Sequence, residues 1–302
     1  MTGKLDLYTN ITNQIIAAIE GGANGDQWVC PWHHSGSPVM RPTSAAGRRY
    51  SGINRLILWA IAERYQYSSG TWATFQQWKN HGGQVRKGEK GAHVVLWKRA
   101  DTATNDQTDG EDANKGRVFA RTFCVFNKDQ VAGIDPEAIG EPFSPETTQA
   151  QALEYLKAFG VPINFGLYDA YYRPDIDQIF APCPESFIDT GAMLATISHE
   201  VAHASGHHTR ENRDSLLNYH KDQSAHALEE LVAELGASYL MADLGLSYAP
   251  RPDHAQYIES WLVHLKNDPK AIFTAARLAQ AAAERIHSTC QASLGEGLAQ
   301  AA

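Results

Sequence analysis

The sequence predicts an α+β protein of two domains, a mixed helix/β-hairpin N-terminal domain and a mostly helical C-terminal one. Three observations carry this prediction. Apolar residues recur at helical intervals in most segments. Segments 93–100 and 117–127 instead concentrate β-branched and aromatic residues. The 302 residues, 43% hydrophobic and 20% charged, have ordinary globular composition and are enough for two domains.

The N-terminal domain is expected to span residues 1–138. Its first helix has apolar side chains at helical spacing, namely Leu5, Tyr8, Ile11, Ile15, Ile16 and Ile19. A second helix is expected from about Asn54 and a third over 71–82. Segments 93–100 and 117–127 then form a β-hairpin whose long, acidic, apolar-poor tip lies between them.

The C-terminal domain is expected to span residues 144–302, after a segment rich in Gly and Pro. Its first helix should have Ser144 as N-cap and Pro145 at the first position, and should end at Gly160. An extended stretch over 170–182 follows. Further helices are expected near 190–207 and 225–242, and then two more, of which the last is capped by Asp268 and Pro269.

Composition restricts where the protein works. The N-terminus lacks a basic start with an unbroken apolar run, and no window approaches the roughly 18 to 20 apolar residues of a membrane-spanning helix. The cysteines, Cys30, Cys124, Cys183 and Cys290, are far apart and form no C-x-x-C pair. We therefore expect a soluble protein of the reducing cytoplasm, without a membrane partner.

The stretch ISHEVAHASGHH contains an H-E-x-x-H motif within an otherwise apolar helix. Positions i and i+4 of a helix are neighbours, so His199 and His203 can bind one metal ion. A catalytic zinc site needs a third protein ligand and an open position for water. Glu200, next to the first histidine, is placed to act as general base on that water.

A glutamate on the following helix is the predicted third ligand. A histidine six residues after His203 would be the alternative, but that position is Thr209. The stretch ELVAELGA instead matches E-x-x-A-E-x-x-A, the pattern of gluzincin-type zincin domains. It favours Glu230 as ligand and Glu234 as a hydrogen-bond partner of a ligating histidine. Glu229 remains the rival, because a shift of one residue exchanges the two.

A short motif of this kind also occurs by chance, so the surrounding sequence matters. The motif lies in the apolar stretch AMLATISHEVAHASG, where unpaired imidazoles and a carboxylate would be costly to bury. An acidic helix of the right pattern follows within about 30 residues. The sequence therefore favours a Zn²⁺ site, which another divalent metal would also fit.

Charge is unevenly distributed along this acidic chain, whose formal net charge is −8. Residues 41–99 carry eleven Arg and Lys against Glu63 and Glu89, a net charge of +9, whereas the remainder carries −17. Phosphate binding depends on the local field. Aromatic residues interleave with these cations, as a single-strand-binding groove requires. Trp72, Phe75 and Trp78, however, have helical spacing, which is more often typical of a core than of a stacking surface. The candidate DNA-binding residues are Arg48, Arg49, Trp72, Arg86, Lys87, Lys90, Trp97, Lys98 and Arg99.

Several stretches together resemble the ArdC antirestriction proteins of conjugative plasmids. They are WVCPW, YSGINRLIL, WATFQQWKNHGGQVRKGEKGAHVVLWK, FCVFNKDQ, YYRPDIDQIFAP, ISHEVAHASGH and EELVAELGASYL, which cover nearly the whole chain in order. The resemblance implies an N-terminal single-stranded-DNA-binding domain and a C-terminal zincin-like metallopeptidase domain. It also implies that the two together protect incoming plasmid DNA from host restriction.

Three functions remain open on the sequence. The first is this antirestriction role, with a host protein as a further candidate partner and the strand 177–182 as the edge along which a substrate peptide would add. The second is a metal-dependent peptidase that acts independently of DNA. The third is a DNA-binding protein whose metal only stabilises the fold.

Overall fold

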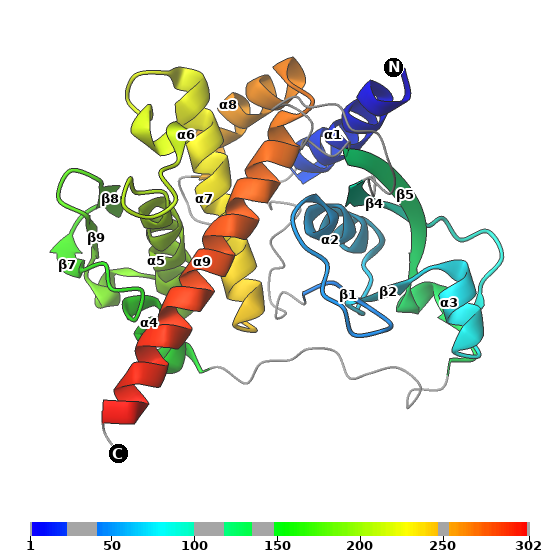
Figure 1. The fold of residues 1–302 in the computed structure, drawn as a ribbon, viewed down its shortest axis with the longest axis horizontal. Helices are drawn as coiled ribbons and strands as arrows, with labels where there is room; N and C mark the ends of the chain where they lie inside the picture. The colour runs from blue at the N-terminus through cyan, green and yellow to red at the C-terminus, as the bar shows by residue number, and fades with distance from the viewer. Residues whose placement is uncertain (1, 23–40, 100–117, 135–147, 247–253, 301–302) are drawn as a thin grey trace, which may run out of the picture.

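The structure is a computed structural model that describes residues 2–22, 41–99, 118–134, 148–246 and 254–300. Figure 1 shows a sheet-containing N-terminal half beside a mostly helical C-terminal half, in which the long α9 crosses in front of α7. The predicted α+β class is confirmed. Within the described residues, no helix is both long and apolar enough to cross a membrane.

Within the described residues, the N-terminal half combines three helices with four strands of two or three residues and one long antiparallel hairpin. Its main sheet has the order β1-β2-β5-β4, and β4 pairs with β5 as an antiparallel hairpin with Ala92 opposite Val125. The predicted hairpin is therefore present, and its tip lies outside the described residues. The elements are α1 (Thr2–Gly22), β1 (Thr43–Ser44), α2 (Ile53–Tyr65), β2 (Thr71–Ala73), α3 (Phe75–Asn80), β3 (Gln84–Val85), β4 (Ala92–Arg99), β5 (Val118–Asn127), η1 (Lys128–Gln130) and β6 (Val131–Ala132).

The helix expected over 71–82 is wrong in its first part. Residues 71–73 form β2, which pairs with β1 on one side and β5 on the other. The helix begins only after Thr74, whose hydroxyl accepts from the Gln77 amide while the Gln77 side chain accepts from the Thr74 amide. This capping box fixes the start of the helix. A strand of three residues is too short for its alternation of apolar and polar side chains to be distinguished from helical spacing.

The C-terminal half is mostly helical, with a small sheet at one side. Its elements are α4 (Gln149–Lys157), β7 (Ile163–Leu167), β8 (Tyr171–Arg173), β9 (Gln178–Pro182), η3 (Pro184–Ser186), α5 (Thr190–Ser205), α6 (Asp214–Leu217), α7 (Gln223–Asp243), α8 (His254–Asn267) and α9 (Ala271–Gln300). Thr148, which has extended backbone angles, is the N-cap of α4. The predicted cap Ser144 and the following Pro145 lie outside the described residues.

The small sheet overturns one expectation about substrate binding. Its order is β7-β9-β8, with β9 parallel to β7 and antiparallel to β8. The strand within 177–182 is therefore central, and both of its sides already have a neighbour. A peptide cannot add along it, and the free edges of this sheet belong to β7 and β8.

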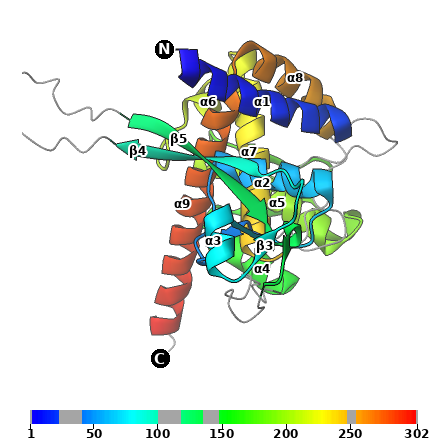
Figure 2. The same ribbon diagram turned by 90° about the vertical axis from the view of Figure 1, so that its right-hand side faces the viewer.

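One hydrophobic core joins the two halves. It includes Ile15 of α1 and Leu56 of α2 together with Leu235 of α7 and Ile272 of α9, all at most 1% exposed. Figure 2 shows α1 lying across the top of the molecule above the β4–β5 hairpin. Helices α5 and α7 approach closely at Gly236, where an added Cβ would lie 3.0 Å from Cβ of Ala202.

A buried ion-pair cluster lies at the contact between α2 and α7. The Arg55 guanidinium donates to Asp243 Oδ1 at 2.8 Å and to the Tyr239 carbonyl at 2.9 Å. It also lies over the rings of Trp59 and Tyr239. Arg41 approaches Asp243 Oδ1 at 2.9 Å. Arg41 and Arg55, two cations of the basic 41–99 segment, thus pair with a carboxylate of the C-terminal half and are not available to bind a ligand.

Candidate metal centre and nucleic-acid surface

Helix α5 holds the two histidines of the motif. Its N-cap Asp189 accepts from the Ala192 amide at 2.7 Å, and almost every side chain from Met193 to Ser205 is buried. His199 and His203 are 3% and 6% exposed. Their Nε2 atoms lie 3.1 Å apart, as one turn of helix predicts.

Glu230 completes a three-residue group with these histidines. Its Oε2 lies 3.6 Å from His199 Nε2, and its Oε1 lies 3.5 Å from His203 Nε2. One ligand atom from each residue fits within 4.8 Å of the others. Two nitrogens bound at 2.0–2.1 Å to a tetrahedral zinc ion would be roughly 3.3 Å apart, so these spacings fit a divalent ion with little movement.

Glu229, the rival ligand, contacts this group only on the outer side of His203. Its Oε1 accepts from Arg213 at 2.6 Å and lies 3.1 Å from His203 Nδ1. Its Oε2 accepts from Ser215 at 2.6 Å and from Arg213 at 3.1 Å. Because both oxygens are engaged, Glu229 is suited to orient His203, and Glu230 is the carboxylate available as a ligand.

Each histidine therefore has a carboxylate near its Nδ1 atom. Oε2 of Glu234 lies 3.5 Å from His199 Nδ1, while Glu229 occupies the same place for His203. A carboxylate on the outer ring nitrogen leaves Nε2 as the ligating atom and raises its basicity. Glu234 lies beside His199, but Oε2 and Nδ1 form no hydrogen bond at this distance, so its role as hydrogen-bond partner stays a prediction. The matching role of Glu229 was not predicted.

The carboxylates around His199 and His203 favour a bound cation. Burial lowers the pKa of His203, but Glu229 and Glu230 outweigh it and raise that pKa to about 10. Burial raises the pKa of Glu230, and both histidines outweigh it and hold that pKa well below its usual value. These carboxylates thus retain a positive charge beside them. A divalent ion would replace that proton, since metal binding and protonation compete for the same imidazole.

Arg213 and Gly206 support the site, and the sequence does not predict this role for either. Arg213 is 3% exposed and donates to Glu229, to the Ser205 hydroxyl at 2.8 Å and to the Ala202 carbonyl at 2.7 Å. An added Cβ on Gly206 would lie 2.6 Å from the Arg213 guanidinium, so only glycine leaves it room. Arg213 belongs to no short motif, and nothing in its local sequence signals this role.

Tyr219 is a further residue whose role the sequence does not predict. Its hydroxyl donates to Glu230 Oε1 at 2.5 Å. Its ring stacks on His226, with centroids 4.2 Å apart, and meets the His203 ring edge-on. The ring is half-buried, and it brings a phenol to the solvent side of the three-residue group.

The candidate DNA-binding cations fall into three groups. Arg48, Arg49, Lys87 and Lys90 are exposed. Arg86 is also exposed, but its guanidinium donates to Glu89 Oε1 at 2.8 Å and to the Asp129 carbonyl at 2.6 Å, so it also fixes a turn. The side chains of Lys98 and Arg99 lie outside the described part of the structure.

The candidate aromatic residues separate into core and surface. The proposed stacking role of Trp72 is wrong, because its side chain is 1% exposed and packs in a core cluster with Leu58 and Val125. Trp97 is 40% exposed and lies near the Tyr8 ring. It lines a cleft of about 760 Å³ between the halves that also contains Lys270 and Arg277.

Comparison with known proteins places both halves. Residues 5–126 match the N-terminal domain of the anti-restriction factor ArdC, and residues 150–278 match a zincin-like metallopeptidase family. The crystal structure of the metal-free antirestriction ArdC protein from the R388 plasmid is similar with a TM-score of 0.77 and 34% identity. That similarity covers 95% of this chain and 98% of the other. The chain belongs to the ArdC antirestriction family.

Other similar proteins extend this placement. The Mn(II)-bound structure of the R388 ArdC protein matches with a TM-score of 0.75 and 34% identity, over 94% of this chain and 98% of that one. Protein y4eC of Sinorhizobium fredii is 42% identical over 94% of this chain and 92% of its own length. The DNA primase TraC of Escherichia coli is 33% identical over 90% of this chain but only 26% of its own length. A zincin-like domain and a Mn(II)-bound ArdC relative together indicate a divalent metal.

Proposed function

We propose that this ArdC-family protein binds single-stranded DNA through its N-terminal half and protects incoming conjugative plasmid DNA from restriction in the host cytoplasm. The family relation across nearly the whole chain carries this proposal. The exposed cations Arg48, Lys87 and Lys90 support it, because phosphates are bound by accessible Lys and Arg side chains. Residues 1–138 and 144–302 are the domains we assign to DNA binding and to the metal centre.

The second part of the proposal concerns the metal. His199, His203 and Glu230 would hold Zn²⁺, with another divalent ion as the alternative. Such an ion, when bound, polarises a carbonyl group and makes a water molecule more acidic. Glu229 and Glu234 orient the histidines, and Tyr219 orients Glu230.

Glu200 distinguishes a hydrolytic site from a purely structural one. It is 3% exposed on α5, directly after His199. A structural metal needs no further carboxylate there, whereas peptide hydrolysis needs a base that takes a proton from the attacking water and returns it to the departing amine. We therefore favour a peptidase site, with a host protein as substrate, over a metal that only stabilises the fold.

Plasmid transfer into a restricting recipient tests which half provides protection. The variants are Glu200→Gln, which keeps the histidines, and a charge reversal of Arg48, Lys87 and Lys90. Reversal of Lys157, Lys221 and Arg173, exposed cations of the other half, is the matched control. We expect protection to survive Glu200→Gln and the control, and to fail when the N-terminal cations are reversed.

The opposite result is equally informative. If Glu200→Gln loses protection while it still binds metal and DNA, peptide hydrolysis is the working activity. If cleavage of a substrate protein proceeds without DNA and the N-terminal cations are dispensable, the protein is a peptidase that acts independently of DNA.

A further inference from the structure

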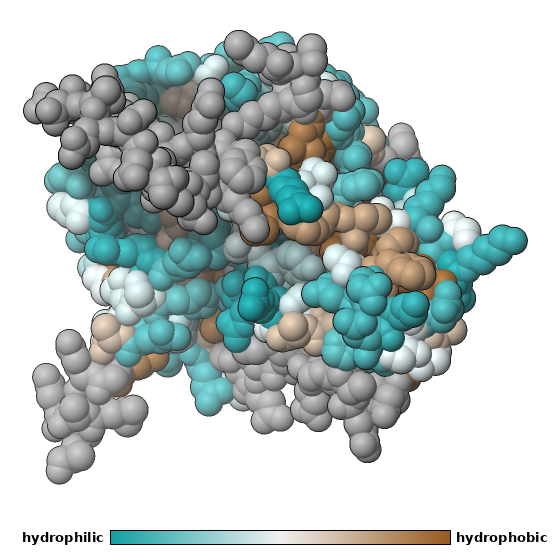
Figure 3. Space-filling model, turned by 45° about the vertical axis from the view of Figure 1, so that its right-hand side comes forward, coloured by the Kyte–Doolittle hydropathy of each residue, from teal (hydrophilic) through white to brown (hydrophobic). Residues whose placement is uncertain are grey.

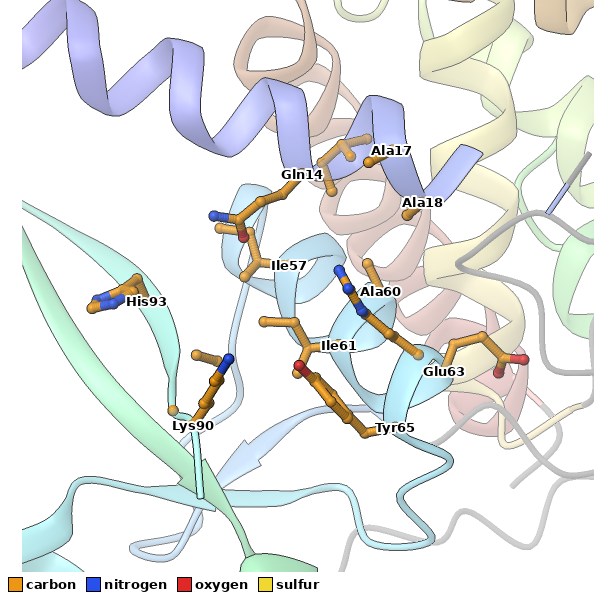
Figure 4. Close-up of a pocket in the computed structure, with 14 residues that line it drawn as sticks. Gln14, Ala17, Ala18, Ile57, Ala60, Ile61, Glu63, Tyr65, Lys90 and His93 are labelled. Carbon is orange, nitrogen blue, oxygen red and sulfur yellow. The ribbon is translucent and has the colours of Figure 1, made fainter. Parts of the chain in front are cut away.

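A groove on the N-terminal half lies between α1, the end of α2 and the start of β4. It has a volume of about 690 Å³, within the range of small-molecule pockets. Its apolar part comes from Ile57, Ile61 and Ala60 of α2 and from Ala17 of α1. In Figure 4, Lys90 lies opposite Ile61 and Tyr65 across this space, and Gln14 and Ala17 of α1 form another side.

Among the described residues, the rim of the groove carries two cations and one acidic residue. Arg64 and Lys90 line it together with Glu63, and the His93 ring lies beside them. Lys90 also belongs to the exposed basic turn that contains Lys87, so the groove opens beside the cations proposed to bind phosphates. Figure 3 shows brown and pale side chains in a band bordered by hydrophilic ones on this side of the molecule.

An aromatic platform stands at the groove. Tyr65 is 47% exposed and stacks on Tyr67, with ring centroids 5.7 Å apart and planes 21° apart. Tyr67 in turn meets the buried Trp72 edge-on at 6.0 Å. The buried tryptophan thus supports, through Tyr67, a ring that is partly exposed. The Arg64 guanidinium lies over this ring, 5.8 Å from its centroid, so a base stacked on Tyr65 would also contact Arg64.

We propose that this groove binds an unpaired base of the single strand, stacked on Tyr65, with the adjoining phosphates held by Lys90 and Arg64. Apolar walls, an exposed ring and flanking cations are what single-strand binding requires. An apolar peptide segment would fit the apolar walls, but it has no negative charges to pair with Lys90 and Arg64. This inference rests on the proposed DNA binding and adds the place where a base is held.

The test measures the affinity of the full chain for two labelled strands, oligodeoxythymidine and an abasic strand of equal length. Tyr65→Ala should weaken binding of oligodeoxythymidine by about 5- to 150-fold, since stacking of one base contributes about 1–3 kcal/mol. Binding of the abasic strand should change little. Phe75→Ala is the matched control, because Phe75 is 48% exposed on α3, outside the groove.

A second pair of variants tests the groove without removing the ring. Ala17→Glu adds a carboxylate at an exposed helical position in the groove, and Ala292→Glu makes the same change at an exposed position of α9. Only the first should weaken binding of both strands. Photocrosslinking of a strand with 5-iododeoxyuridine should label Tyr65.

Two failures are distinguishable. If the wild-type chain binds no single strand, the proposed function itself fails, and the groove proposal fails with it. If it binds, but Tyr65→Ala and Ala17→Glu bind as well as their controls and crosslinks map elsewhere, the groove is not the base site. If Ala17→Glu abolishes binding of an apolar peptide that competes with neither strand, the groove belongs to a protein partner.

Discussion

The two halves of this protein differ in how well the spacing of residues in the sequence predicts the positions of their functional side chains. In the C-terminal half, His199 and His203 are separated by one helical turn, and their Nε2 atoms meet at 3.1 Å. In the N-terminal half, the cations and rings that the sequence places together are dispersed by the fold. Trp72 is in the core, Arg55 and Arg41 contact Asp243, and Arg86 fixes a turn.

This difference has a physical cause. A metal centre on one helix depends on backbone geometry that any helix shares, so sequence spacing predicts side-chain position. A nucleic-acid groove depends on which faces of several short elements remain exposed after packing. Composition reports that cations and rings are present, but not which of them are accessible.

The largest expected effect concerns the third ligand. Glu230→Gln should abolish one-to-one metal binding, because only the two histidines would remain as strong ligands. Elemental analysis after dialysis against excess zinc measures the metal content. If Glu230→Gln retains one ion per chain, residue spacing predicts the functional site of the C-terminal half no better than that of the N-terminal half.

Arg55→Met tests whether the two halves depend on the cluster at Asp243. Its loss removes the closest partner of a buried carboxylate that keeps Arg41 and His287. Losing a hydrogen bond to a charged group typically costs about 1.5–3 kcal/mol in free energy of unfolding. Urea unfolding in the presence of a chelator measures this. Arg64→Met, an exposed arginine of the same helix, should change the free energy of unfolding by less than about 1 kcal/mol. Equal effects would mean that the cluster does not join the halves.

Acid should weaken the same contact. Burial raises the pKa of Asp243, but Arg55, His287 and Arg41 outweigh it and lower that pKa to about 2. Because the folded-state value is lowered, the stabilisation is complete above about pH 5 and is lost as pH falls through 4 towards 2. The total expected loss is about 2–3 kcal/mol, of which about half appears by pH 3, and Asp243→Asn should abolish it.

Unfolding by urea at pH 5, 4 and 3 measures this acid dependence. Glu154→Gln, which removes an exposed carboxylate, should leave the slope unchanged. A slope that Asp243→Asn does not flatten would assign the acid sensitivity to other carboxylates.

Glu229→Gln sharpens the distinction between ligand and support. Metal should still bind one-to-one, but about 10- to 100-fold more weakly, as is typical when the partner of a ligating histidine is lost. Competition with a chromophoric chelator gives the affinity. Complete loss of metal would instead make Glu229 a ligand.

The smallest expected effect is at a single phosphate contact. Lys87→Ala should reduce the slope of log affinity against log salt concentration by about 0.7 for a single strand. Anisotropy titrations at several salt concentrations provide the slope. Lys221→Ala in the other half is the control, and an unchanged slope for Lys87→Ala would place the phosphates elsewhere.

The sequence by itself determined the α+β class, the β4–β5 hairpin and the pair of histidines on α5. It also favoured Glu230 and Glu234, because ELVAELGA matches the pattern E-x-x-A-E-x-x-A. Each of these follows from local periodicity, which neighbouring residues enforce on one another.

Only the tertiary structure decided the rest. It separated Glu229 from Glu230 by supplying Arg213 and Ser215, residues distant enough that no motif includes them. It buried Trp72, placed β9 between two strands and joined both halves in one core. These outcomes depend on packing between elements far apart in the sequence, so the spacing of residues within any one segment could not reveal them.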